Sequence, residues 1–180
     1  MKRLILFVLI LMLMCVEPIN ANAKTVNRYT TQTVALKDKA KGKVIYKVKR
    51  NTKVRQISVG KAWARVKYKG KKLYVRKKYL SKLKSPKKYT GAYFKRAGVI
   101  NWKGYKYTWY SQRVLSGNGL KIKGRHVDKQ GFVCDQNNYI VLGSNVANRG
   151  KIVATPFGKF GRVYDVGYVT TNWFDCYVAW

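Results

Sequence analysis

Apolar and basic residues alternate through the first half of the chain, and this pattern limits the folds open to it. Val44, Tyr46 and Val48 fall at every second position between lysines. Successive side chains of a β-strand point to opposite faces, so a period of two predicts strands with one buried and one solvated face. Turn signals at Arg50-Asn51 and Lys69-Gly70 separate the runs and predict a small barrel or sandwich. The later runs are Ala64, Val66 and Tyr68, then Leu73 and Val75.

Positive charge dominates the whole chain, with 39 Lys and Arg residues against 6 Asp and Glu. Residues 24–90 carry a net +23, with Asp38 as their one acid, and residues 91–180 carry +9. An excess of this size needs anionic partners, such as nucleic acid, anionic lipid or the phosphate-bearing polymers of a bacterial wall. No RNP-like aromatic pattern, helix-turn-helix or zinc knuckle favours nucleic acid. A basic, soluble surface without a specific partner is the alternative.

The first 23 residues have the layout of a cleavable secretory signal. Met1-Lys2-Arg3 precedes about a dozen apolar residues, and Ala21-Asn22-Ala23 ends the segment with small residues. The apolar run is shorter than the roughly 20 residues that span a bilayer, which disfavours a permanent anchor. A lipid on Cys15 is also disfavoured, because the bulky Met14 precedes it. We expect cleavage after Ala23 and a secreted, wall-associated mature chain with a net charge of +32.

Composition divides the mature chain into two units. The polar stretch from Ser81 to Lys88 contains a proline and is typical of a linker. Of the 25 aromatic residues, 17 lie in residues 91–180, which therefore have enough large side chains for a core of their own. We predict a first domain over 24–83, a linker and lead-in segment over 84–104, and a second domain over 105–180. The expected strands of the second domain are Tyr107–Tyr110, Phe132–Asp135, Tyr139–Leu142, Lys151–Thr155, Gly161–Asp165 and Trp173–Trp180.

Seven segments of the first unit occur in a recognisable order: Thr33–Lys37, Lys43–Tyr46, Thr52–Val54, Trp63–Val66, Gly70, Tyr74-Val75 and Tyr79-Leu80. Together they resemble a bacterial SH3 domain over about residues 28–83. The resemblance implies an SH3-like small barrel that attaches extracytoplasmic proteins to the cell wall.

The last predicted strand, Trp173–Trp180, carries a carboxylate on its open side. Alternation places Phe174, Cys176 and Val178 on the apolar face together with Trp180, and Asp175 on the other face between two aromatic residues. Aromatic rings stack on sugar faces, and partial desolvation raises the pKa of a carboxyl group towards that of a general acid. The pattern therefore indicates a sugar groove, with an ordinary exposed aspartate as the alternative.

Five motifs of the second unit also occur in a recognisable order: Tyr107–Ser111, Gly124–Val127, Thr155–Gly158, Val163–Gly167 and Phe174–Tyr177. Together they resemble the three-aspartate (3D) domain, a six-stranded double-psi β-barrel similar to lytic transglycosylase A, rare lipoprotein A and the expansins. Asp165 and Asp175 match two of the three acids of that family. The third acid is absent from its usual place, where this chain has Leu142–Asn145, and Tyr168–Asn172 replaces the usual small residues.

This resemblance implies an enzyme that cleaves peptidoglycan glycan strands without a metal or cofactor. Asp175 would be the acid/base and Asp165 its supporting carboxylate, while Asp128 would be dispensable. A hydrolase with two carboxylates and a non-catalytic wall-binding protein are the alternatives. The predicted partners are peptidoglycan and anionic wall polymers, bound by a monomer. The expected glycan contacts are Trp109, Tyr110, Trp173, Tyr177 and His126.

Two cysteines and one histidine remain to be placed in the mature chain. Cys134 and Cys176 are compatible with a disulfide in an exported protein, and equally with two buried free thiols. A zinc site would need further ligands beside His126, but the chain has no second histidine and no thiolates at zinc spacing, so we predict no metal site. A cysteine-peptidase pair of Cys134 and His126 is disfavoured, since Phe132–Asp135 predicts a strand and the usual nucleophile opens a helix.

Overall fold

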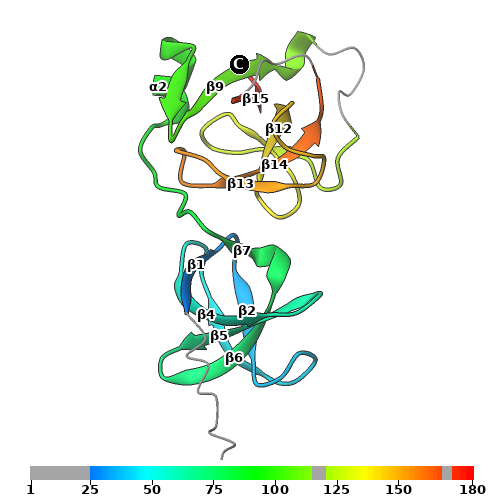
Figure 1. Ribbon diagram of the computed structural model, residues 1–180. Coiled ribbons are helices and arrows are strands. Elements are labelled where there is room, and N and C mark those ends of the chain that lie inside the picture. The colour runs from blue at the N-terminus through cyan, green and yellow to red at the C-terminus, as the bar shows by residue number, and fades with distance from the viewer. Residues whose placement is uncertain (1–24, 115–120, 168–171) are drawn as a thin grey trace, which may run out of the picture.

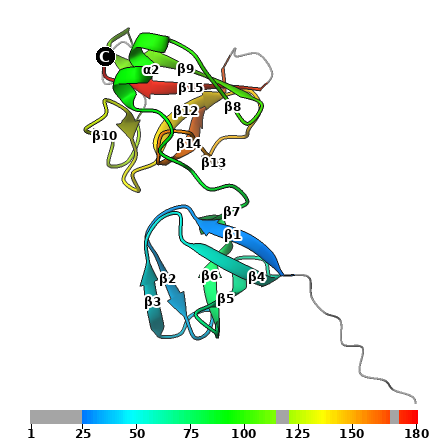
Figure 2. The same ribbon diagram turned by 90° about the vertical axis from the view of Figure 1, so that its left-hand side faces the viewer.

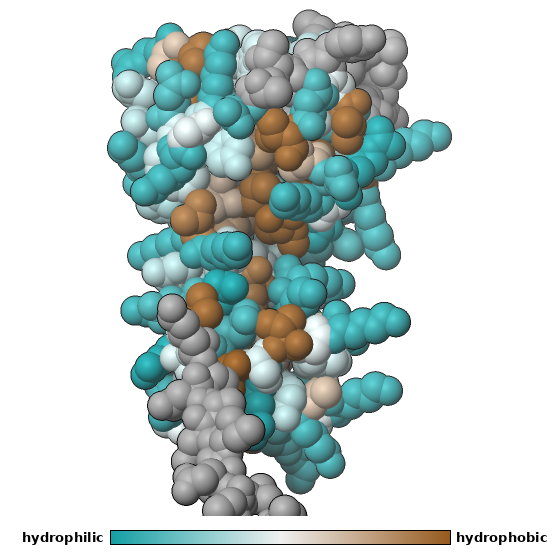
Figure 3. All heavy atoms as spheres, in the orientation of Figure 1, coloured by the Kyte–Doolittle hydropathy of each residue, from teal (hydrophilic) through white to brown (hydrophobic). Residues whose placement is uncertain are grey.

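The computed structural model describes residues 25–114, 121–167 and 172–180, and these form two units that follow one another along the chain (Figure 1). The model is mostly β, which confirms the coarse part of the fold prediction. Hydrophilic side chains project from both units, and apolar ones gather in the part of the second unit nearest the first (Figure 3). Within the described residues, no helix has the length and hydropathy needed to cross a membrane.

The first unit is a seven-stranded antiparallel sheet with the order β3-β2-β6-β5-β4-β1-β7. A 3-10 turn, η1 (Lys77–Tyr79), joins β6 to β7. The β5–β6 hairpin turns at Lys69 and Gly70, which both have positive φ, as the right-handed twist of two-residue hairpins requires. The strands are β1 (Val26–Thr30), β2 (Val34–Lys37), β3 (Val44–Val48), β4 (Lys53–Val59), β5 (Trp63–Tyr68), β6 (Lys71–Arg76) and β7 (Leu80–Ser81).

The predicted alternation sets the core of the first unit, with one error. Val48, Ala64, Val66, Leu73 and Val75 are buried, and Tyr46 and Tyr68 are partly buried, but Val44 is 55% exposed. It begins β3, which lies at the edge of the sheet, and the β2–β3 register shifts between Leu36 and Lys37. The shift displaces Val44 from its expected inward position. The buried core residues are Val34, Leu36, Val48, Val54, Ala64, Val66, Leu73 and Val75.

The second unit is an eight-stranded mixed sheet. Its main path runs β10-β11-β12-β15-β9-β8, and β14 adds to β12 and pairs with β13. Two of its pairs, β9 with β15 and β12 with β14, are parallel. A 3-10 turn, η2 (Gln112–Val114), follows β9. The strands are β8 (Ile100–Trp102), β9 (Tyr105–Ser111), β10 (His126–Val127), β11 (Val133–Cys134), β12 (Ile140–Ser144), β13 (Ile152–Ala154), β14 (Phe160–Asp165) and β15 (Trp173–Val178).

All six predicted strands of the second unit are present, at shifted boundaries, and β8 and β10 add two that we did not predict. In the described residues neither sheet closes into a barrel, so closed barrels are not part of the observed fold. The main core is aromatic-rich, with Phe94, Tyr107, Phe132, Phe157 and Phe174 buried at its centre.

The segment 84–104, predicted as a linker and lead-in, contains a helix and strand β8. Helix α2 (Gly91–Ala97) begins after Thr90, whose hydroxyl accepts a hydrogen bond from the backbone N–H of Tyr93, and it ends at Gly98 with φ 68°. Both are standard capping signals. The helix lies in front of β9 and β15 (Figure 2), and Phe94 inserts into the main core of the second unit.

The polar stretch before this helix is tied to the second unit. Ser85 is fully buried, and its hydroxyl donates to the carbonyl of Thr155 at 2.6 Å. The backbone N–H of Gly158 donates to the carbonyl of Pro86 at 2.8 Å, and Lys87 forms an isolated bridge with Phe157. These bonds fix the path of the chain as it enters the second unit.

Candidate functional site

One row of residues crosses four neighbouring strands of the second sheet. Gly143 of β12 pairs with Asp165 of β14 on one side and with Asp175 of β15 on the other. Asp175 in turn pairs with Thr108 of β9. Residues in register on adjacent strands point to the same face, so both aspartates border Gly143 on one face. Their Cα atoms are two strand spacings apart, about 10 Å.

A local irregularity in β14 brings Asp165 into this row. The register moves from Leu142–Val163 to Gly143–Asp165, so Tyr164 is an extra residue between them. Such bulges re-aim side chains, and without this one Tyr164 would stand beside Gly143. The position of Asp165 thus depends on tertiary pairing as well as on strand alternation.

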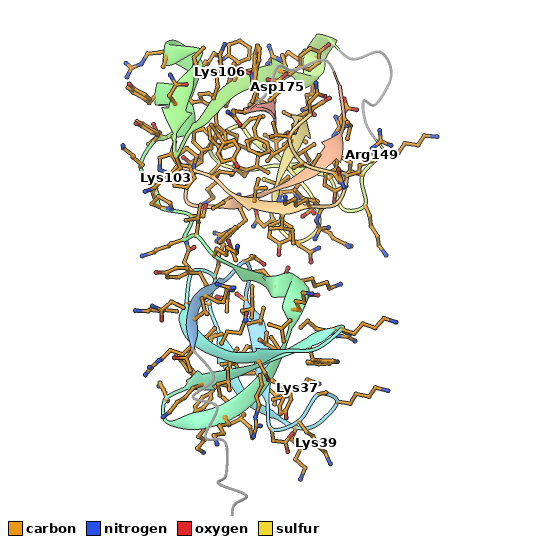
Figure 4. The ribbon with its side chains drawn as sticks, viewed as in Figure 1. Lys37, Lys39, Lys103, Lys106, Arg149 and Asp175 are labelled. Carbon is orange, nitrogen blue, oxygen red and sulfur yellow. The ribbon has the colours of Figure 1, made fainter. Side chains whose placement is uncertain are left out.

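Strand β15 divides its side chains as the alternation predicts. Phe174, Cys176 and Val178 are buried in the main core, and Trp180 packs against it. Asp175 lies on the opposite face, in the part of the second unit that is far from the first unit (Figure 4).

Asp175 is a half-buried carboxylate with one oxygen engaged. Its Oδ1 accepts a hydrogen bond from the Thr108 hydroxyl at 2.8 Å, and that hydroxyl accepts one from the indole N–H of Trp173. No hydrogen bond occupies Oδ2 among the described residues. Burial raises the pKa of Asp175, and the Thr108 hydrogen bond opposes part of that increase. The group is therefore oriented, and its neutral form persists to higher pH than that of an exposed aspartate.

Asp165, in contrast, lies beside a cation. Its Oδ2 accepts a hydrogen bond from the Tyr177 hydroxyl at 2.9 Å, and its Oδ1 lies 3.8 Å from the guanidinium of the exposed Arg149, which is too long for a hydrogen bond. Burial, with the Asp165 hydrogen bond next, raises the pKa of Tyr177 and keeps it a donor. Asp165 holds the Tyr177 ring in place more than it offers a free carboxylate.

Gly143 is buried beneath the shared face of the two acids. A Cβ added there would lie 3.7 Å from Cβ of Asp175 and 3.7 Å from Cε2 of Tyr177, which is ordinary contact distance. The Tyr177 ring is tilted against the Tyr110 ring, with centroids 5.7 Å apart. Because Gly143 has no side chain, Asp175 and the Tyr177 ring can lie close over β12.

The predicted glycan contacts divide into two groups. Trp173 and Tyr110 lie on the face of Asp175, and the ammonium of Lys106 lies 4.0 Å from the ring centre of Trp173. Figure 4 shows Lys106 and Asp175 as neighbours.

The other three predicted contacts are not available to a glycan at this face. Tyr177 shares the face of Asp175, but it is 7% exposed and packs in a small core with Val133 and Val141. Trp109 lies on the other face, packed edge-on against Trp180. In the strand order, exposed His126 of β10 is three strands from β15. The prediction of Tyr177, Trp109 and His126 as glycan contacts of this site is therefore wrong.

The remaining described acids have structural roles or lie elsewhere. Asp135 is fully buried, accepts hydrogen bonds from two backbone N–H groups and from Tyr164, and pairs with Arg162 at 3.1 Å. Asp128 pairs with Lys159 at 2.5 Å and accepts two backbone N–H bonds. Both carboxylates therefore stabilise the fold and are not available to a substrate.

Cys134 and Cys176 are buried free thiols, so the disulfide alternative is wrong for this structure. Strand β12 lies between them, because Cys134 pairs with Ile140 and Cys176 with Leu142 of that strand. Burial raises the pKa of the Cys134 thiol to about 12. In the described part of the chain, no cluster of His, Cys, Asp and Glu has the arrangement of a metal site.

Sequence reasoning missed three members of the site: Thr108, Gly143 and Arg149. Thr108 lay within a predicted strand, and its partner Asp175 is 67 positions away. Gly143 was noted only as part of a segment that departs from a motif. Tyr168–Thr171, which belong to the other departing segment, lie outside the described residues. Comparison of the chain with family models, curated proteins and solved structures finds no match.

Proposed function

We propose that this is an exported cell-wall protein whose second unit cleaves peptidoglycan glycan strands in the manner of a lytic transglycosylase. Asp175 is the acid/base in this proposal, and Asp165 is its support. One observation carries the argument: of the two acids on this face, Asp175 combines an oxygen that accepts no hydrogen bond from the described residues, a fixed orientation and a pKa raised by burial.

The different surroundings of the two acids favour this reaction over two-carboxylate hydrolysis. Hydrolysis needs a second carboxylate to attack the sugar or to activate water. Asp165 already accepts a hydrogen bond from Tyr177 with one oxygen, and its other oxygen faces the guanidinium of Arg149 at 3.8 Å. A lytic transglycosylase needs one carboxyl group, because the substrate supplies its own nucleophile.

The reaction then follows from the position of Asp175. Its neutral carboxyl donates the Oδ2 proton to the glycosidic oxygen, and the bond between that oxygen and the anomeric carbon breaks. The carboxylate takes a proton from a hydroxyl of the same sugar, whose oxygen bonds to the anomeric carbon and forms an anhydro end. Thr108 holds Oδ1 throughout. Tyr110, which is exposed, supplies a ring surface beside the acid for stacking on the sugars, whereas Lys106 covers one face of the Trp173 ring.

The charge and the predicted secretory signal support a wall location. We propose that residues 1–23 direct export and that the SH3-like first unit, with its net +23, holds the protein on anionic wall material. The two parallel strand pairs of the second unit fit the resemblance to a double-psi barrel, and the resemblance itself remains part of the proposal.

The decisive experiment is release of anhydro-ended fragments from purified sacculi by the mature chain and by Asp175→Asn. The variant keeps the shape of the side chain and removes the proton, so release should fall by about 10²- to 10⁴-fold. Asp38→Asn is the matched control, since it makes the same change at a turn of the first unit. Equal release by Asp175→Asn and wild type would contradict the acid/base role.

Asp128→Asn is not a suitable control, although the sequence marked Asp128 as dispensable. The substitution would leave the ammonium of Lys159, which is 13% exposed, without its partner carboxylate. Breaking a pair of this kind destabilises a protein by about 3–5 kcal/mol. A loss of activity in that variant would report unfolding.

A non-catalytic wall-binding protein is the second candidate. The observation in its favour is the segment Leu142–Ser144, which carries no acid where the 3D family has its first aspartate. Here Ser144 is fully buried, with its hydroxyl donating to the carbonyl of Trp173 at 3.2 Å. If the wild-type chain binds sacculi of several kinds and releases nothing from any of them, this second function replaces the first.

A further inference from the structure

Two hollows on the surface meet at the loop between β1 and β2. The first lies on the sheet of the first unit, beside Trp63 and Arg76, and the second lies at the seam between the units, beside Arg50 and Asn138. Each has a volume of about 460 Å³. Gln32 and Thr33 line both of them, so the two hollows adjoin at this loop. Together they are called the track, which extends from the first unit to the edge of the second.

The track is lined by cations from several elements. Lys37, Lys41 and Arg76 line the first hollow, and Lys49 and Arg50 line the second. None of the residues that line either hollow is an acid. Figure 4 shows that Lys37 lies well away from the second unit, so the charges are spread along the track and do not form a single cluster.

Among the cations that line the two hollows, Arg50 is the one whose charged form is disfavoured by burial. Burial lowers the pKa of its guanidinium, yet no ion pair joins it to a carboxylate among the described residues. A partly desolvated charge without a partner is costly, and a charge-assisted hydrogen bond to an anion would offset that cost. The guanidinium fork suits an oxyanion that can accept two parallel hydrogen bonds.

The walls of the seam are held by hydrogen bonds between the units. The side-chain amide of Asn51 donates to the carbonyl of Ser85 at 2.8 Å and accepts from its N–H at 3.0 Å. The hydroxyl of Tyr139 donates to Oε1 of Gln32 at 2.9 Å and lies 2.8 Å from the hydroxyl of Thr31. The second hollow is thus built before a ligand arrives, which lowers the entropic cost of binding.

We propose that this track binds a linear phosphodiester polymer of small polyols, with one phosphate held by Arg50 at the seam. Cations spread along a groove fit an anion with repeated charges better than a single small ion. This proposal deepens the wall association proposed above and rests on it for the setting in which the polymer is met.

Two other polyanions fit the track less well. Single-stranded nucleic acid binds by stacking bases on free aromatic faces, but here Arg76 lies 4.6 Å from the ring centre of Trp63, and Lys78 lies 5.2 Å from that of Tyr79. These cations already cover ring faces at the track. A lipid bilayer presents a flat layer of head groups, whereas Arg50 lines a concave hollow between two units.

The test is the affinity of the mature chain for a synthetic glycerol-phosphate oligomer, measured by calorimetry at several salt concentrations. Arg50→Gln should weaken binding by about tenfold or more, as expected for a charge-assisted hydrogen bond. It should also lower the log–log salt slope by about 0.7, the value for one contact to a single-stranded phosphate polymer. Arg55→Gln removes the same charge from an exposed position of β4 outside the track and should weaken binding by less than about threefold. Lys49 is exposed and also lines the second hollow, so Lys49→Gln should weaken binding as Arg50→Gln does without unfolding the seam.

Equal losses in Arg50→Gln and Arg55→Gln would overturn the proposal, because they would assign the binding to overall charge. If a single-stranded DNA oligomer binds more tightly, with the same dependence on Arg50, the partner of the track is a nucleic acid and not the polyol-phosphate polymer. Asp175→Asn should bind the oligomer like the wild type, and Arg50→Gln should release fragments normally from sacculi stripped of phosphate polymers. The binding assay with Arg50→Gln therefore tests the polymer site, and the release assay with Asp175→Asn tests the cleavage reaction, so either proposal can be contradicted without the other.

Discussion

The two sheets use their charged residues in opposite ways. In the first unit the strands are all antiparallel, the core is aliphatic, and the cations stand on the outside. In the second unit the strands are mixed, the core is aromatic, and two of its four acids, Asp128 and Asp135, are buried in ion pairs. The first unit is suited to binding through accessible charge. The second unit uses half of its acids in these pairs, and Asp175 differs from them because one of its oxygens accepts no hydrogen bond from the described residues.

The largest expected effect concerns the buried acid network of the second unit. Asp135→Asn would leave the guanidinium of Arg162 without a carboxylate and weaken the hydrogen bonds from Asn137, Tyr139 and Tyr164. We expect a loss of about 3–5 kcal/mol in the free energy of unfolding, measured by urea denaturation. In the first unit, Asp38→Asn should change stability by less than about 0.5 kcal/mol. Similar losses in both variants would remove the contrast between the units.

A smaller effect is expected from adding a side chain at Gly143. A single Cβ fits at ordinary contact distance, so Gly143→Ala should fold normally and retain most of its cleavage activity. Gly143 is buried, so the branched methyl groups of Gly143→Leu have to displace Asp175 or Tyr177. A displacement of about 1 Å should lower glycan release by about 100-fold. The comparison of the two folded variants in the sacculus assay tests whether the position of Asp175 limits cleavage. Full activity in Gly143→Leu would contradict the role of Asp175.

The sequence predicted the parts of the molecule that depend on local pattern. The alternation of β15 located Asp175 opposite Phe174 and Cys176, and turn chemistry located the hairpin at Lys69-Gly70. The row through Gly143 could not be predicted, because it joins strands far apart in sequence and depends on the bulge at Tyr164. Helix α2 was missed because seven residues are too few to show a helical period, although Thr90 and Gly98 marked its ends.

Misassigned aromatic residues have a related cause. Trp109 and Tyr110 are adjacent in a strand, so only one of them can face Asp175. Without the register of β9 against β15, neither residue could be preferred from the sequence. The pairing of Tyr110 with Tyr177 decides the question, and it leaves Trp109 in contact with the core.

Tyr177 allows a structural role within the site to be distinguished from a role in catalysis. Tyr177→Phe removes the hydrogen bond to Oδ2 of Asp165 and leaves the ring in place. Loss of one such bond costs about 1 kcal/mol, so we expect a modest fall in stability and a fall of about tenfold or less in glycan release. Its pH–rate profile should keep the wild-type shape, because Asp175 is unchanged. A displaced profile would show that Tyr177 takes part in the proton transfer.

The smallest effect is the pH dependence of stability caused by Asp175. Burial raises its pKa in the folded protein above that of the unfolded chain, so the folded state binds more protons in the window between the two values. Stability of the wild type therefore falls as pH rises through that window, and the cost is fully present above the folded pKa.

Asp175→Asn does not titrate and should escape this cost. Thermal unfolding should show the variant more stable than the wild type by about 0.5 kcal/mol at neutral pH, with the difference vanishing below the pKa of the unfolded carboxyl. Asp38→Asn, made at an exposed turn, should show no such convergence. A variant that is less stable at neutral pH would mean that the Thr108 hydrogen bond to the carboxylate outweighs the desolvation of Asp175. In that case the carboxyl group would be held ionised, and the second unit would use Asp175 for structure as it uses Asp135.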